Sequence, residues 1–152
     1  MDEIRTSKLE KALSSPYSDL DTFFVDNTSG LITEERPFTT YMRSLFVKHN
    51  TRPKLVFDRA DIPLRYGYRI ISGEKHTKQR DFILRICYSA DFTLEETQRA
   101  LQIYGMNRLY ARYPRDAVLI YAFEHGITDI SKVNEMLASR DMTTLSELGV
   151  TE

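Results

Sequence analysis

The residues best suited to chemistry gather between positions 59 and 80, and that chemistry is hydrogen bonding to bases and phosphates. Arg65 and Arg69 are four residues apart, so a helix would set them on one face. A guanidinium group offers two parallel hydrogen bonds to a guanine edge or a phosphate. Tyr66 and Tyr68 lie beside them. Each could donate a hydrogen bond to phosphate, pack on a thymine methyl group or simply close the core. The candidate phosphate contacts are Arg59, Tyr66, Tyr68, Lys75, Lys78 and Arg80.

Catalytic and metal-binding residues do not form a recognisable pattern. The three histidines, His49, His76 and His125, are far apart and lack the spacing of metal ligands. Cys87 is the single cysteine, and its apolar helical surroundings favour a buried small hydrophobe over a nucleophile. No glycine-rich phosphate loop is present. We therefore expect no enzyme activity, no cofactor and no metal site.

The arginines lie in a segment that predicts two short helices joined by a tight turn. The first helix would begin at Pro53 and end near Ala60. The second would span 63–72 and stop at Gly73. Its inward side would carry Ile62, Gly67 and Ile70 or Ile71, with the glycine allowing two backbones to approach closely. Its outward side would carry Leu64, Arg65, Tyr68 and Arg69.

This segment resembles the helix-turn-helix of the phage-repressor class of regulators, the Xre family. RADIPLRYGYRIISGEKHTKQRDFILRI, followed by LEETQRALQIYGMNRLYARYPRDAVLIYAFEHG, is similar to a divergent branch of that class from Gram-positive bacteria. The resemblance covers roughly residues 37–145. It implies a five-helix domain in which the second helix of the helix-turn-helix, about 63–72, enters the DNA major groove. It also implies base contacts by Leu64, Arg65 and Arg69.

Two departures from the class stand in the first helix. Pro53 replaces a polar residue that touches phosphate, and Phe57 replaces a small alanine.

Apolar spacing elsewhere predicts helices throughout, hence an all-α fold. An amphipathic helix is expected over 34–50, and Thr93 with Glu96 predicts a capping box that opens a helix over 94–104. His125 is expected to cap the helix that starts near Tyr113. Asp81 and Asp116, which follow Arg80 and Arg115, are expected to form caps or local ion pairs. Further helices are predicted over 3–14, 19–27, 78–90 and 128–137, with a closing turn at 145–148.

These elements divide into three parts. Residues 1–36 form an N-terminal helical arm, 37–106 the helix-turn-helix domain, and 107–152 a C-terminal helical extension packed on the same core. The extension could equally form a homodimer interface, and the sequence leaves both alternatives open.

The composition is that of an ordinary globular protein, with 41% apolar and 28% charged residues and a net charge of −1. The charge is uneven: residues 37–112 hold 14 basic and 7 acidic side chains, whereas 1–36 hold 4 and 8, and 113–152 hold 3 and 7. A basic middle favours a phosphate-binding module, although an ordinary charged surface gives the same pattern.

No apolar run is long enough for a membrane span and no signal peptide is evident, so we expect a cytoplasmic protein without membrane contact.

Two functions follow. The first is a transcriptional regulator that binds double-stranded DNA. The second is a degenerate helix-turn-helix protein that binds a protein partner as an adaptor, which the apolar Leu64 and aromatic Tyr66 and Tyr68 favour. Basic side chains gathered around the second helix would support the transcriptional regulator. Basic side chains scattered over the surface would support the adaptor.

Overall fold

The computed structural model describes residues 6–14, 19–21 and 36–145. Within these ranges the chain forms eight helices and no strand, which confirms the all-α class. The chain divides into two compact units, residues 1–35 and 36–152. The helices are α1 (Thr6–Ser14), α3 (Pro37–Lys48), α4 (Pro53–Ala60), α5 (Leu64–Ser72), α6 (Arg80–Ser89), α7 (Leu94–Ile103), α8 (Pro114–Glu124) and α9 (Ile130–Ala138). The predicted helix over 19–27 and the turn at 145–148 fall largely outside the described residues.

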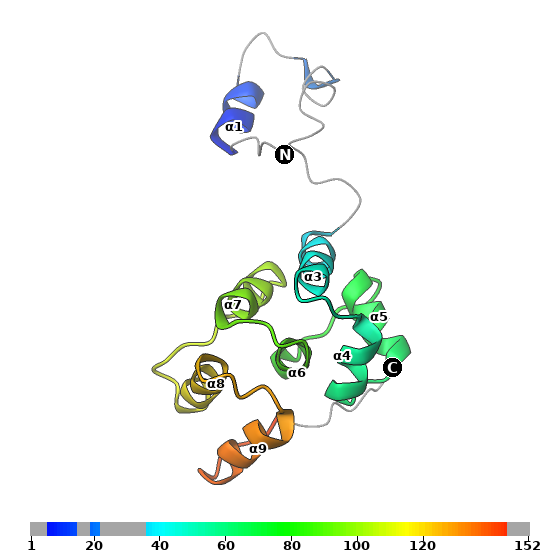
Figure 1. Cartoon of the computed structure of the whole chain (residues 1–152). Coiled ribbons are helices and arrows are strands. Elements are labelled where there is room, and N and C mark those ends of the chain that lie inside the picture. Colours follow the sequence, from blue (N-terminus) through cyan, green and yellow to red (C-terminus); the bar gives the residue numbers. More distant parts are fainter. Residues whose placement is uncertain (1–5, 15–18, 22–35, 146–152) are drawn as a thin grey trace. The chain divides into compact units, whose positions relative to one another are not determined.

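Helix α6 is the centre of the second unit (Figure 1). Helices α4, α7 and α9 pack against it, and every residue from Phe82 to Ser89 is buried. A helix that is surrounded by other helices has no solvent-facing side, so apolar periodicity does not reveal the full extent of its burial. Arg85 is buried too, and its guanidinium donates to the backbone oxygens of Ala60 and Leu145.

The two helices predicted around the turn are confirmed. Pro53 stands in the first turn of α4, and Asp61 ends that helix in the left-handed region with φ of 54°. The N–H of Ile62 then bonds the oxygen of Phe57 at 2.9 Å. Helix α5 begins at Leu64, one residue later than predicted, and ends at Gly73, whose φ of 82° suits glycine.

Gly67 is the contact point between α4 and α5. A Cβ at this position would lie 2.8 Å from the ring atoms of Phe57. Phe57 is itself fully buried. Phe57 therefore occupies the space that Gly67 leaves free, so the close approach is of a ring to a backbone and not, as predicted, of two backbones.

Helices α8 and α9 extend the same core. The ring of Tyr88 on α6 stacks on Phe123 of α8 at 3.9 Å between centroids, and its hydroxyl donates to the oxygen of Leu119 at 2.7 Å. Val133 and Leu137 of α9 are fully buried in the common cluster. Asp129 caps α9 by accepting from the N–H of Ser131. His125 bonds the oxygen of Tyr121 at 2.9 Å, as its predicted capping role requires.

The two Arg-Asp dipeptides were predicted to form caps or ion pairs local in the sequence, and this prediction is wrong. Arg80 binds Asp116 and Arg115 binds Asp81, so the dipeptides exchange partners between the first turns of α6 and α8. Both pairs are bidentate. The partners lie 36 and 34 residues apart, a relationship that only the packing of α8 beside α6 creates.

Candidate nucleic-acid interface

The outward face of α5 carries the residues predicted to read bases. Leu64 and Tyr68 are 41% and 45% exposed, and Arg65 is exposed beside them. On the opposite face Gly67, Ile70 and Ile71 are buried. The inner face fixes the helix in the core, and the outer face is available to a partner.

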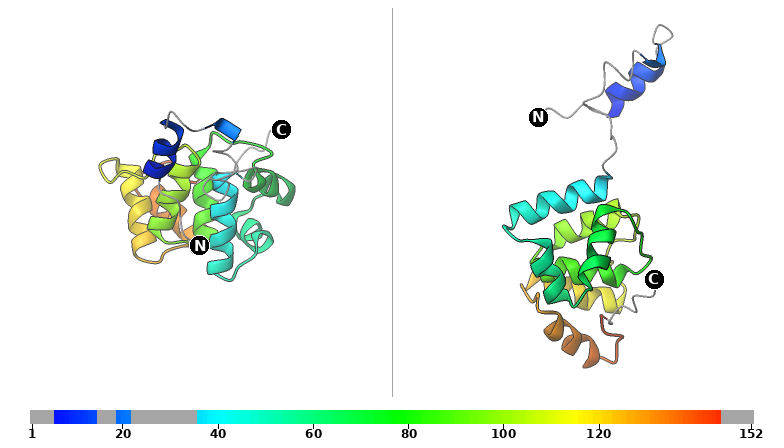
Figure 2. Two further views of the ribbon diagram at one scale, coloured as in Figure 1. Left: turned by 90° about the horizontal axis from the view of Figure 1, so that it is seen from above. Right: turned by 90° about the vertical axis from the view of Figure 1, so that its right-hand side faces the viewer.

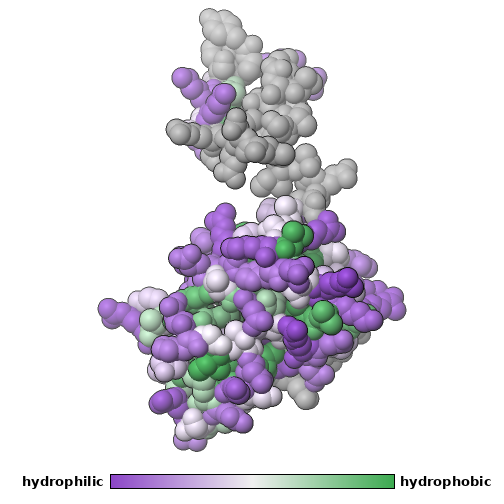
Figure 3. All heavy atoms as spheres, in the orientation of Figure 1, coloured by the Kyte–Doolittle hydropathy of each residue, from purple (hydrophilic) through white to green (hydrophobic). Residues whose placement is uncertain are grey.

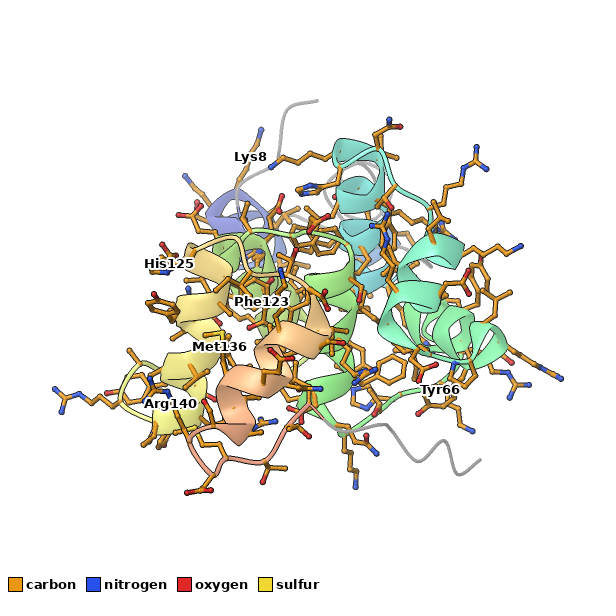
Figure 4. The ribbon with its side chains drawn as sticks, turned by 60° about the horizontal axis from the view of Figure 1, so that its bottom comes forward. Lys8, Tyr66, Phe123, His125, Met136 and Arg140 are labelled. Atoms are coloured by element: carbon orange, nitrogen blue, oxygen red, sulfur yellow. The ribbon has the colours of Figure 1, made fainter. Side chains whose placement is uncertain are left out.

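The two tyrosines of this segment have different surroundings. Tyr66, labelled in Figure 4, is half-buried. Its ring meets Phe82 of α6 edge to face at 5.2 Å between centroids. Tyr68 meets Phe57 edge to face at 5.3 Å and still exposes nearly half its surface. Tyr66 thus helps to close the core, whereas Tyr68 presents its ring on the outer face.

Arg69 lies at the end of this face. Its Nε is 3.6 Å from a carboxylate oxygen of Glu74, and its side chain is 33% exposed. A shallow hollow of about 410 Å³ lies on this face and is lined by Arg65, Tyr68, Arg69, Ser72 and Glu74. The Glu74 carboxylate would repel phosphate and already pairs with Arg69, so anion binding here depends chiefly on Arg65.

The predicted phosphate contacts scatter. Arg59 points from α4 to the end of α6, where it donates to the oxygen of Ser89 at 3.4 Å. Arg80 is held by Asp116 of α8. Lys75 is half-buried in a cavity between α3, α5 and α7, while Lys78 is exposed in the loop before α6.

Two other exposed basic side chains were not predicted as contacts. Arg52 and Lys54 flank Pro53 at the start of α4, and both are exposed. The N-terminus of a helix carries a partial positive charge that favours anions. The signal was present in the sequence, since Pro53 marks a first turn and basic residues adjoin it on both sides.

Other ionisable groups serve the fold. Burial raises the pKa of Cys87 to about 12, which leaves the thiol protonated and unreactive as expected. Thr93 and Glu96 form the predicted capping box, and the Glu96 carboxylate also binds Lys48 at 2.9 Å and His49 at 2.8 Å. In the described ranges no three His, Cys, Asp or Glu side chains gather as a metal site would require.

The face of the second unit drawn in Figure 3 mixes hydrophilic and hydrophobic residues. No helix within the described parts of the chain combines the length and apolar character needed to cross a membrane.

Comparison with family models, curated proteins and solved structures found no match for this chain.

Proposed function

We propose that this protein is a cytoplasmic DNA-binding transcriptional regulator of the phage-repressor type, in which α5 enters the major groove. The observation that carries the proposal is the pairing of α4 with α5 through a tight turn, which buries one face of α5 and exposes Leu64, Arg65 and Tyr68 on the other. An α-helix fits the major groove of B-DNA, and its exposed residues then meet base edges.

Two arginines supply the hydrogen bonds in this arrangement. Arg65 and Arg69 would donate to guanine edges, and Leu64 would make apolar contact with bases. Arg52 and Lys54, at the exposed start of α4, would bind phosphates on the flanking strand. They take over the role that the repressor class gives to the residue at Pro53. A homodimer on a two-fold operator would follow the pattern of the class.

A second function is favoured by the scatter of the basic residues. Arg59 and Arg80 contact α6 and α8 instead of surrounding α5, and Leu64 and Tyr68 make the outer face of α5 partly apolar. Aromatic, apolar and arginine side chains in one patch are typical of the centre of a protein interface. The alternative is an adaptor that binds a protein through the same face.

Fluorescence anisotropy with a mixed-sequence DNA duplex separates the two functions. Binding should weaken by a large factor between about 50 and 200 mM salt, since phosphate contacts release counterions. The variant Arg65→Ala with Arg69→Ala should bind more weakly, whereas Arg140→Ala, which removes an exposed arginine at the end of α9, should leave binding unchanged.

An absence of binding even at low salt would reject the regulator. The adaptor would then be tested by co-purification, in which Leu64→Ser with Tyr68→Ser should lose a partner that the wild-type chain retains.

A further inference from the structure

A cavity of about 500 Å³ lies beside the last turn of α5, between the first turn of α3 and the last turn of α7. Its apolar walls come from Phe38, Ile70, Ile103 and Tyr104. Phe38 meets Tyr104 edge to face at 4.6 Å between ring centroids, and His76 stacks on the same tyrosine at 4.4 Å. Tyr104 is held in place because its hydroxyl accepts from the N–H of Thr77 at 2.9 Å. The cavity therefore has rigid aromatic walls.

Charged side chains stand at the edge of this cavity. Arg36 and Lys75 contribute two cations, and Glu74 contributes one carboxylate. Glu74 is directed toward Arg69, on the outer face of α5. The side chain of Arg36 lies over Gly73, in space that a Cβ would fill. Among the described residues, the edge of the cavity thus carries two cations and one carboxylate beside apolar walls.

We propose that this cavity binds a small aromatic carboxylate. The aromatic ring would lie between the apolar walls, where offset and edge-to-face contacts are favourable. The carboxylate would accept charge-assisted hydrogen bonds from Arg36 and Lys75. The cavity volume lies within the range of small-molecule sites, which combine mostly apolar walls with a few polar groups.

The position of the cavity gives such a ligand a regulatory role. Ile70 belongs to α5 and Gly73 ends it, so a bound ligand would touch the end of the helix that we propose to read DNA. This regulatory consequence rests on the proposed function, whereas ligand binding itself does not require DNA.

A matched pair of probes tests the site in the full-length chain. Naphthalene-2-carboxylate and naphthalene-2-carboxamide have nearly the same shape and differ in charge. Titration followed by NMR of the ¹⁵N-labelled protein should shift the amides of Gly73, Thr77 and Tyr104, and the carboxylate should bind about tenfold more tightly than the amide.

Two variants assign that preference to the cations of this cavity. Arg36→Gln with Lys75→Gln should make the two probes equal in affinity. Arg140→Gln is the matched control, because Arg140 lines a second cavity of about 520 Å³ with Tyr121 and Met136, between α8 and α9 (Figure 4). This control should keep the tenfold preference.

Three results would overturn the proposal: no shifts at millimolar probe, shifts confined to α8 and α9, or equal affinity of the two probes for the wild-type chain. Unchanged α8 and α9 spectra show that the double variant is folded. The titration contains no DNA, so its outcome is independent of the anisotropy experiment. Adding the carboxylate to the DNA complex then tests regulation separately.

Discussion

The guanidinium of Arg80 holds the buried carboxylate of Asp116 with two hydrogen bonds of 2.5 and 3.2 Å, and so ties the start of α6 to the start of α8. Asp116 also accepts from the N–H of Tyr110 at 2.9 Å and so fixes the loop between α7 and α8. Figure 2 shows this loop in yellow-green and yellow. The neighbouring pair, Arg115 with Asp81, repeats this contact in the opposite direction. The side chain of Asp116 is 3% exposed, so this carboxylate meets the Arg80 guanidinium largely out of contact with water.

We expect Arg80→Ala to lower the free energy of unfolding by about 3 kcal/mol, because it leaves a buried carboxylate without its cation. Urea unfolding of Arg80→Ala, Asp116→Ala and the double variant forms a thermodynamic cycle. The double variant should be less destabilised than the sum of the single variants. Additive losses would mean that the two side chains do not stabilise each other. Arg140→Ala, at an exposed position, should change stability by less than about 0.5 kcal/mol.

Gly67→Ala should destabilise the protein although alanine favours helices by about 1 kcal/mol. The added methyl group would lie 2.8 Å from the Phe57 ring, and overpacking of this kind typically costs about 1–3 kcal/mol. Phe57→Leu should relieve the clash, so that Gly67→Ala becomes neutral or stabilising in that background. Thermal unfolding of the four proteins measures both effects. An equal loss in both backgrounds would show that the glycine is needed for another reason.

Local signals in the sequence predicted much of the fold. Pro53, Asp61 and Gly73 mark the ends of α4 and α5, because proline and residues of positive φ act through the backbone alone. The same holds for the capping box of Thr93 and Glu96. Relationships that depend on packing were not predictable. The exchange of partners between the two Arg-Asp dipeptides requires α8 to lie beside α6. Arg85 is buried, although arginine is ordinarily found at the surface, so its residue type did not indicate its position.

The candidate site was predictable to the same extent. The spacing of Arg65 and Arg69 placed both on α5, since four residues make about one helical turn. The direction of Arg59 and Arg80 depends on neighbouring helices, which explains why proximity in sequence did not bring them to the face of α5.

Cys87 should be unreactive in the folded protein. Its side chain is fully buried, and burial raises the pKa of its thiol to about 12, so almost no thiolate exists at pH 8. We expect Ellman's reagent to leave the native protein unmodified for hours and to label one thiol promptly in 6–8 M urea, a concentration typical of unfolding experiments. Rapid labelling without urea would mean that α6 opens locally.

Glu96 should make stability depend on pH in the acidic range. Burial raises the pKa of this carboxyl, but hydrogen bonds from the backbone of Thr93 and from Lys48 and His49 outweigh burial and lower the pKa from 4.5 to about 2. A lowered native pKa means that the unfolded chain binds the proton more readily. The stabilisation is therefore complete above pH 4.5 and is lost as the pH falls from 4.5 to about 2.

The variant Glu96→Gln isolates this charge, because glutamine keeps the shape of the side chain and an oxygen that accepts from Thr93. We expect it to lower the free energy of unfolding by about 1–2 kcal/mol at pH 7, the range of a lost helix cap. Urea unfolding at pH 7, 4 and 2 should show this difference shrinking as the pH falls, with only a small part left at pH 2, where the native pKa lies. Glu95→Gln, which changes an exposed neighbour in the same first turn, should show little effect at pH 7. A difference for Glu96→Gln that stays constant down to pH 2 would mean that the loss comes from packing, since protonation would then leave it unchanged.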